Sequence, residues 1–201
     1  MRARSCRASD GYFVLPYTIG DYLAPLLGQQ PVPTDDPVFQ AAEAGQHDQV
    51  RQLLSINGQR SVDDIHRELG TVMWDNCGMA RTEQSLTKAL SEIPAIREEY
   101  WKNVRVLGDG LGRNPALERA QRVADFIDFG ELLCFDALHR NESCGGHFRE
   151  EYQTEEGEAL RDDVNFAYVA AWELTDVGSA PVLHKEPLEF ETVHLATRSY
   201  K

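Results

Sequence analysis

The sequence predicts a mainly α-helical protein: an antiparallel three-helix (spectrin-like) bundle, preceded by extra helices and followed by an extended tail that contains β-strands. Two observations support this prediction. Three consecutive segments, near residues 61–76, 82–106 and 115–141, each carry one apolar stripe of helical period and are joined by short connections, as in helices that pack side by side. Beyond residue 163 the apolar residues instead favour strands.

Composition and charge limit the possible functions. With 201 residues, 42% of them hydrophobic, the chain can bury the core of one domain or one and a half. Its net charge of −13 argues against binding to nucleic acid and against a direct electrostatic grip on anionic lipid. No apolar run approaches the roughly 20 residues of a membrane span, and no signal-peptide core directly follows Arg2, Arg4 and Arg7. We therefore expect a cytosolic chain.

The cysteines Cys6, Cys77, Cys134 and Cys144 lie far apart in the chain, with no C-x-x-C pair. In a reducing compartment such cysteines are most simply free thiols.

The segments before the bundle predict helices and a linker. Residues 11–27 are dense in aromatic and aliphatic side chains, so we expect a buried helix bent around Pro16 and Gly20. Three prolines and two acids make residues 29–37 a linker. Residues 38–56 have one apolar side and should form a helix that stops at Asn57 and Gly58.

Capping residues mark where the bundle helices begin. Ser61 starts the first, with Asp64 three residues on as an imperfect capping box. Thr82 opens the second, in which Pro94 is expected to introduce a bend. The expected buried stripes are Ile65, Leu69, Val72, Met73 and Trp74 in the first helix, and Leu86, Ala89, Leu90 and Ile93 in the second.

The third helix is the central element of the predicted fold. Asn114 can cap it, and Pro115 suits a first turn, where a missing N–H costs nothing. Its stripe comprises Leu117, Ala120, Ala124, Ile127, Cys134 and Leu138, and Val123, Phe126, Leu133 and Ala137 widen it, so we expect burial on more than one side. A Gly145–Gly146 turn follows and presents His147 and Arg149.

The tail changes character. Residues 153–163 are acidic and should be exposed to solvent. Residues 166–174 are aromatic and β-branched, and residues 188–195 alternate apolar and polar, so both read as strands that form a hairpin or paired extended segments.

Two weak patterns have structural explanations. The spacing of Gly108, Gly110 and Gly112 is GxGxG and not the dinucleotide-binding GxGxxG, so we interpret this stretch as a connection between helices. His139, Cys144 and His147 could approach one another, but a structural zinc site needs a fourth ligand, which is not evident.

Two further sets of polar residues concern the third helix and its end. Glu131 falls on the apolar stripe, where we expect a salt bridge or an edge position and not a catalytic acid. Glu142, His147 and Arg149 form the most functional-looking cluster. They could touch a substrate, or lock this module against a neighbouring domain through charge-assisted hydrogen bonds, and we favour the second role.

Long motifs in the chain carry a family resemblance. ALHRNESCGGHFREEY, residues 137–152, resembles the Arg-x-Glu-Ser-x-Gly-x-His-x-Arg block of succinate dehydrogenase and fumarate reductase flavoproteins, and L-aspartate oxidase has a similar block. IHRELGTVMWDNCGMARTEQSLTKAL, residues 65–90, resembles the helix pair of this family. The resemblance extends over almost the whole chain, to the final Arg198, Ser199, Tyr200 and Lys201. Cys144 stands where many members carry Arg.

The resemblance implies the C-terminal part of a flavoprotein subunit. Residues 10–30 would be the last helix of the flavin-binding domain, 31–60 a linker and connecting helix, 61–150 the C-terminal helical bundle and 151–201 the tail. In the intact subunit, FAD would exchange electrons between succinate or fumarate and an iron–sulfur subunit. The family's catalytic and FAD-binding residues lie upstream, so we expect no catalytic, cofactor or metal site on this fragment, which should be inactive alone. The implied interdomain contacts are Glu142, His147 and Arg149.

The resemblance also implies partners and a place in the cell. The expected partners are the flavin-binding domain of the same subunit, the iron–sulfur subunit and, indirectly, a membrane cytochrome b anchor. The assembled subunit would lie in the cytoplasm at the inner face of the cell membrane.

The genetic code suggests an origin for residues 1–9. Residues 1–9 can be encoded by GTG CGA GCG CGC TCA TGC AGG GCC TCN, with GTG as a start codon read as Met. If a G precedes the start codon, the frame that begins one base upstream reads GGT for Gly and then Ala-Ser-Ala-Leu-Met-Gln-Gly-Leu. Related flavoproteins carry this sequence just before the Asp-Gly-Tyr-Phe found here at residues 10–13. We therefore expect residues 1–9 to be an out-of-frame leader, with a flavin-domain reading frame upstream; the alternative is an unrelated extension.

Two other kinds of protein remain as alternatives. One is a freestanding helical interaction module without redox activity, which a neighbouring flavin-domain gene would argue against. The other is a thiol- or metal-regulated protein, which would show tight zinc binding or a redox-sensitive Cys144.

Overall fold

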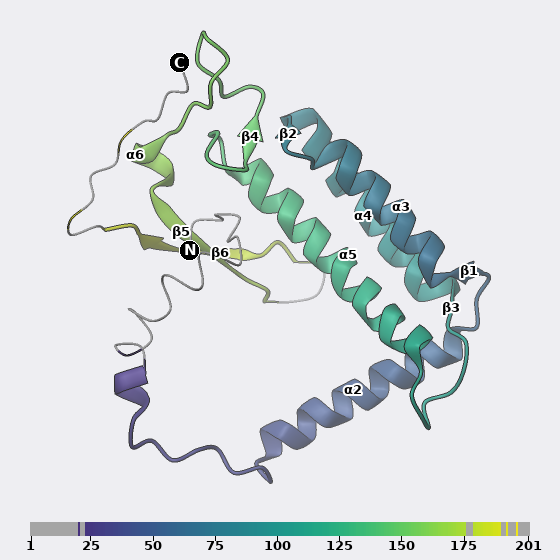
Figure 1. The fold of residues 1–201 in the computed structure, drawn as a ribbon. Helices are drawn as coiled ribbons and strands as arrows, with labels where there is room; N and C mark the ends of the chain where they lie inside the picture. Colours follow the sequence, from purple (N-terminus) through teal and green to yellow (C-terminus); the bar gives the residue numbers. More distant parts are fainter. Residues whose placement is uncertain (1–19, 21–22, 176–178, 190–191, 193–195, 197–201) are drawn as a thin grey trace. The chain divides into compact units, whose positions relative to one another are not determined.

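The computed structural model describes residues 20, 23–175, 179–189, 192 and 196. The chain divides into two compact units: Gln30–His139, and Met1–Gln29 together with Arg140–Lys201. Residues 1–9, where the sequence predicts an out-of-frame leader, and most of residues 10–22 lie outside the described part. Figure 1 labels the helices and strands.

The first unit is helical. In chain order it contains α2 (Pro37–Ile56), β1 (Arg60–Ser61), α3 (Val62–Asn76), β2 (Ala80–Arg81), α4 (Glu83–Asn103), β3 (Val104–Arg105) and α5 (Pro115–His139). Figure 1 shows α3, α4 and α5 side by side, with α4 running opposite to the other two. β1 pairs in parallel with β3 at the end of the bundle where α3 begins and α4 ends. The predicted antiparallel three-helix bundle is confirmed.

The core of this unit lies between the three bundle helices, where apolar side chains from each are fully or almost fully buried. They include Ile65 and Leu69 of α3, Leu86, Ala89, Ile93, Ile96 and Tyr100 of α4, and Leu117, Ala120, Val123, Ala124, Ile127, Cys134 and Ala137 of α5. Tyr100 also donates a hydrogen bond from its hydroxyl to the Ala120 carbonyl, at 2.6 Å. Burial, with the nearby Asp125 carboxylate, raises the pKa of Tyr100, so the phenol stays protonated.

The predicted helix boundaries are set by capping residues. Asn57 ends α2 in the left-handed conformation, with φ of 46°. The Ser61 hydroxyl accepts a hydrogen bond from the Asp64 N–H at the start of α3. At the start of α4, Thr82 and Ser85 form a reciprocal capping box. These polar contacts satisfy N–H groups that have no partner within the helix.

Three expectations about the helices were wrong in detail. Trp74 is 84% exposed because it is nine residues after Ile65, which at 100° per residue places it on the opposite side of α3. Phe126 and Leu133 are 45% and 43% exposed, so they do not widen the buried face of α5. α4 continues through Pro94 but ends at Asn103, before Val106.

The second unit is built from short elements. They are the 3₁₀ helix η1 (Ala24–Leu26), β4 (Phe148–Arg149), α6 (Asp163–Phe166), β5 (Tyr168–Glu173) and β6 (Val182–Pro187). β5 and β6 pair antiparallel, from Tyr168 opposite Pro187 to Glu173 opposite Val182. A strand pair in the tail is therefore present and its first strand lies in the predicted segment, but its second strand is not the predicted one.

The positions of the strands and of the first helix differ from the prediction. β6 precedes the expected segment 188–195, of which the described residues 188, 189 and 192 are not in a strand. Phe166 belongs to α6 and not to β5. Within the expected buried helix 11–27, most residues lie outside the described part, and the described η1 buries no residue. Leu23, Leu26 and Leu27 are 44%, 48% and 80% exposed.

In the described part of the chain, no helix is both long enough and apolar enough to span a membrane.

Candidate functional site

The candidate site lies in the loop that follows α5, within the second unit. Its central contact is an ion pair: Arg140 Nη1 donates to Glu142 Oε1 at 2.7 Å. The two side chains are only 8% and 0% exposed. The Arg140 guanidinium also lies over the rings of Phe166 and Tyr168, 5.7 and 5.5 Å from their centroids. The carboxylate and the two aromatic faces offset the free-energy cost of removing the Arg140 charge from water.

Glu142 links this loop to a later segment. Its second oxygen, Oε2, accepts a hydrogen bond from the Asp162 N–H at 3.0 Å, just before α6. The Asp162 carboxylate in turn caps α6 through the Asn165 N–H. One buried side chain thereby joins the loop of residues 140–149 to the beginning of the β-containing tail.

Ser143 closes the loop onto β4. Its hydroxyl accepts from the Arg149 N–H at 2.8 Å and donates to the Arg149 carbonyl at 3.0 Å. Ser143 is fully buried and the Arg149 side chain is 1% exposed. The Arg149 guanidinium pairs with Glu151 at 3.1 Å and lies 5.4 Å from the Tyr152 ring centroid.

His147 stands at the far end of a tight turn. The N–H groups of Cys144 and His147 donate to each other's carbonyls, and Gly145 between them has φ of 63°, a region that favours glycine. The His147 ring places Nε2 3.0 Å from the Arg140 carbonyl. A carbonyl can only accept, so Nε2 carries the proton.

The structure brings the three predicted residues, Glu142, His147 and Arg149, into one hydrogen-bonded loop, but it joins them through Arg140 and Ser143. Our sequence reasoning missed both of these, although the same motif contains them. The Glu142 carboxylate already accepts two hydrogen bonds and is inaccessible to solvent. This arrangement suits holding a loop in one shape better than proton transfer to a bound molecule. The expected role in an interdomain contact stays a prediction.

Glu131 and the glycine-rich stretch have the structural roles that we favoured. Glu131, at a half-buried edge of α5, forms an ion pair with Arg97 of α4, which also binds Asp128 at 2.9 Å. The glycine-rich stretch is the loop between β3 and α5.

The Asn114 side chain holds that loop in shape. The Asn114 side chain accepts from the N–H groups of Ala116 and Leu117, at 3.1 and 3.0 Å. It also donates to the carbonyls of Leu107 and Asp109. The amide oxygen thus occupies two of the N–H groups that an anion at this helix N-terminus would otherwise contact.

The described cysteines are reduced, and one pair of them is in contact. Cys77, Cys134 and Cys144 are free thiols. Although Cys77 and Cys134 are far apart in the chain, their side chains are hydrogen-bonded. Among the described residues, no three His, Cys, Asp or Glu side chains are arranged to hold a metal ion, and this includes His139, Cys144 and His147.

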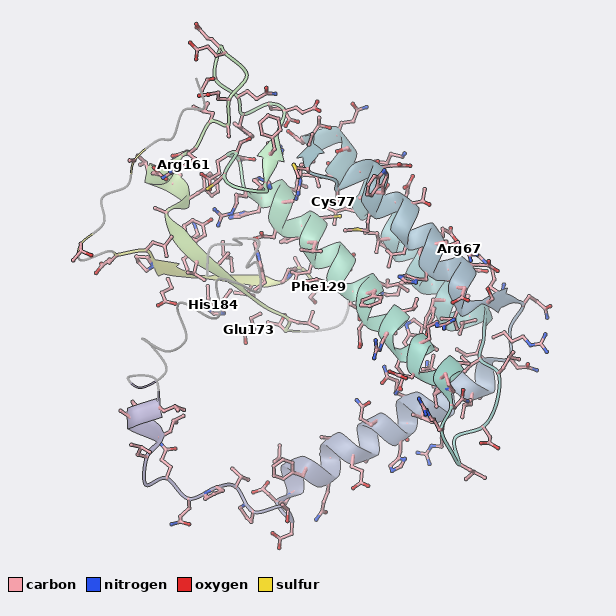
Figure 2. The ribbon with its side chains drawn as sticks, viewed as in Figure 1. Arg67, Cys77, Phe129, Arg161, Glu173 and His184 are labelled. Atoms are coloured by element: carbon pink, nitrogen blue, oxygen red, sulfur yellow. The ribbon has the colours of Figure 1, made fainter. Side chains whose placement is uncertain are left out.

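The helical unit also carries an apolar groove between α3 and α5. Figure 2 labels Phe129, one of the α5 residues that line it. Phe126, Phe129 and Leu133 line the groove and are 45%, 58% and 43% exposed. His66 and Gly70 of α3 line the opposite side, and the His66 ring stacks on Phe126 with centroids 5.6 Å apart.

Known proteins resemble this chain over most of its length. A family model described as the fumarate reductase flavoprotein C-terminus matches residues 66–200. The fumarate reductase flavoprotein subunit of Haemophilus influenzae is 30% identical over 190 residues, covering 93% of this chain and 30% of that protein. The Escherichia coli subunit is 27% identical over 132 residues, which cover 66% of this chain and 21% of that subunit.

Solved structures share the fold. A quinol–fumarate reductase with menaquinol molecules matches with a TM-score of 0.66 at 23% identity, covering 84% of this chain and 28% of that one. Mycobacterium smegmatis Sdh1 in complex with UQ1 matches with a TM-score of 0.57 at 24% identity, covering 85% and 26%. The chain thus spans about a third or less of the length of each of these relatives.

Proposed function

This chain belongs to the family of fumarate reductase flavoprotein C-terminal domains, and on that premise we propose that it is the C-terminal, helical part of a subunit that interconverts succinate and fumarate. The observation that supports this proposal is the match of the family model to residues 66–200, which includes the loop around Glu142. In the proposal, the intact subunit exchanges electrons between its FAD and an iron–sulfur subunit.

The FAD of the intact subunit would be held by a flavin-binding domain outside this helical part. The glycine-rich loop before α5 is filled by its own Asn114 side chain, which argues against a phosphate site there. On this proposal the chain contributes stability and contacts, while binding of FAD and substrate belongs to the remainder of the subunit. The chain alone would therefore lack the activity.

The direct partner that we propose is the flavin-binding domain of the same subunit. The groove between α3 and α5 exposes Phe126, Phe129 and Leu133 together. Contiguous apolar surface of this kind is typical of an interface. Because the Haemophilus influenzae relative is about three times as long as this chain, it contains a further polypeptide large enough to cover the groove.

The buried loop would serve the same contact. With Glu142 and Arg149 inaccessible to solvent, we propose that these residues hold the loop in shape, so that its exposed turn at Gly145 and Gly146 and the half-buried His147 meet the neighbouring domain. The iron–sulfur subunit and, indirectly, a membrane cytochrome b anchor complete the proposed assembly, at the cytoplasmic face of the membrane. Nucleic acid is an unfavourable partner for a chain of net charge −13.

Purification of the affinity-tagged chain from the cells that encode it tests the proposal. We expect a flavin-containing polypeptide and an iron–sulfur protein to co-purify in equal amounts, with dye reduction that depends on succinate. Phe129→Asp should remove these partners, since a carboxylate in an apolar interface is costly. Leu111→Asp is the matched control, because Leu111 is 95% exposed on a loop. A chain that purifies without any flavoprotein would instead support a freestanding interaction module.

A further inference from the structure

Two thiols and an arginine meet where the end of α3 packs against α5. Cys77 caps the C-terminus of α3, where Figure 2 labels it, and Cys134 lies on the buried face of α5. The Cys134 sulfur is 3.7 Å from the Met73 sulfur of α3. Arg81 places Nη1 3.9 Å from the Cys77 sulfur. A partly exposed thiol therefore lies between a buried thiol and a cation.

These neighbours make the two thiols unlike each other. The hydrogen bond from Cys134 lowers the pKa of Cys77 to about 7, with help from the charge of Arg81, although burial opposes the shift. The same hydrogen bond and burial raise the pKa of Cys134, as does the Glu131 carboxylate, while Arg81 opposes the rise. The pair therefore favours a thiolate at Cys77 over one at Cys134, and near pH 7 about half of the Cys77 groups are ionised beside a protonated Cys134.

Arg81 supplies an independent sign that the site is built for negative charge. Its Nε is buried and, among the residues that the structure describes, makes no hydrogen bond. A buried donor left without a partner is costly. A thiolate at Cys77 offsets part of this cost, because its negative charge attracts the positive charge of the Arg81 guanidinium group.

We propose that Cys77 is an oxidation site for hydrogen peroxide and that Cys134 resolves the product as a Cys77–Cys134 disulfide. The Cys77 thiolate attacks one peroxide oxygen; an S–O bond forms, the O–O bond breaks and hydroxide leaves. The Cys134 sulfur then attacks the sulfenic sulfur; an S–S bond forms and the S–O bond breaks. The departing oxygen takes the Cys134 proton and leaves as water, and the hydroxide of the first step takes up the proton that Cys77 released on ionising. Two thiols and one peroxide thus give one disulfide and two waters.

The expected advantage of Cys77 over an ordinary thiol is modest. A decrease in pKa from 9.0 to about 7 raises the thiolate fraction at pH 7 about fiftyfold, while the lower nucleophilicity of the more acidic thiol removes about a factor of ten. We therefore expect Cys77 to react about fivefold faster than an unperturbed thiol. The proposal concerns the helical unit alone and does not depend on the proposed function.

Stoichiometric peroxide added to the reduced full-length chain, followed by alkylation and peptide mapping, tests this. We expect a peptide linked through Cys77 and Cys134, with Cys144 still open to alkylation. Cys134→Ser should instead leave a sulfenic acid at Cys77, trapped by dimedone, and Cys77→Ser should leave Cys134 unoxidised. Arg81→Gln should slow the oxidation severalfold, while Arg81→Lys restores it in part.

The matched control is Arg67→Gln, which removes a charge from the exposed surface of α3, where Figure 2 shows Arg67. It should oxidise at the rate of the unaltered chain. The proposal is overturned if no linked peptide forms, if dimedone labels Cys134 before Cys77, or if Arg81→Gln and Arg67→Gln oxidise equally fast.

Discussion

Glu142 stabilises the second unit because its carboxylate neutralises the buried charge of Arg140. Glu142→Gln keeps the shape of the side chain but leaves the buried Arg140 guanidinium without a counter-charge. Removing one partner of a buried ion pair costs about 3–5 kcal/mol, and the retained amide oxygen should hold the loss near the lower end. We expect faster amide hydrogen exchange in residues 140–173, measured by mass spectrometry, with little change in the bundle helices.

Glu150→Gln is the matched control for this prediction, because Glu150 is exposed in the same loop. It should exchange like the unaltered chain. If Glu142→Gln shows the same exchange as Glu150→Gln, the ion pair with Arg140 does not hold the loop together.

The titration of Cys77 gives a prediction that depends on pH. Its pKa is lowered from 9.0 to about 7, chiefly by the hydrogen bond from Cys134. The thiolate is therefore favoured in the folded state, and its contribution to stability is lost as pH falls through 7 and is fully present above 9. The rate of alkylation by iodoacetamide should rise with a midpoint near pH 7, and Cys134→Ala should move that midpoint upward. A midpoint near 9 in the unaltered chain would show that the hydrogen bond has no such effect.

At the scale of elements, the capping box at the start of α4 can be tested alone. Thr82→Ala removes the hydroxyl that accepts from the Ser85 N–H at 3.0 Å. Loss of such a cap costs about 1 kcal/mol. We expect a lower urea midpoint for the helical unit, followed by circular dichroism. Thr87→Ala, an exposed position inside the same helix, should be neutral or slightly stabilising. Equal midpoints for the two variants would mean that the cap contributes nothing.

The bundle was predictable because its determinants are local. Ser61, Thr82 and Asn114 each act on N–H groups two or three residues away, and the apolar period reports the buried face of a helix directly. Trp74 departs from the expected stripe because its position nine residues after Ile65 places it on the exposed side of α3 despite its hydrophobicity. The tail was harder: the partner of β5 is chosen by pairing across the sheet, which the alternation in residues 188–195 does not determine.

The candidate site was predictable only in part for the same reason. The motif near the end of α5 pointed to Glu142, His147 and Arg149, but their contact with the rings of Phe166 and Tyr168, through Arg140, depends on how the tail returns. No local pattern could have paired Cys77 with Cys134, since only the packing of α3 on α5 brings them together.

At the scale of the whole molecule, a chain that covers 30% of a relative's length and exposes an apolar groove is expected to behave as a part. Purified alone, it should contain no stoichiometric flavin and should not reduce acceptors with succinate. Its exposed Phe126, Phe129 and Leu133 should instead cause self-association that depends on concentration. Absorbance spectra and analytical ultracentrifugation measure the two properties.

The groove is the expected cause of that self-association, so Phe129→Asp should reduce it. Leu111→Asp should not reduce it, because Leu111 is an apolar residue that is 95% exposed on a loop outside the groove. If the two variants self-associate equally, the surface that causes self-association lies elsewhere on the chain. A yellow preparation with one flavin per chain would contradict the assignment of FAD to another domain. The two measurements are independent, because an apolar face can associate whether or not a flavin is bound.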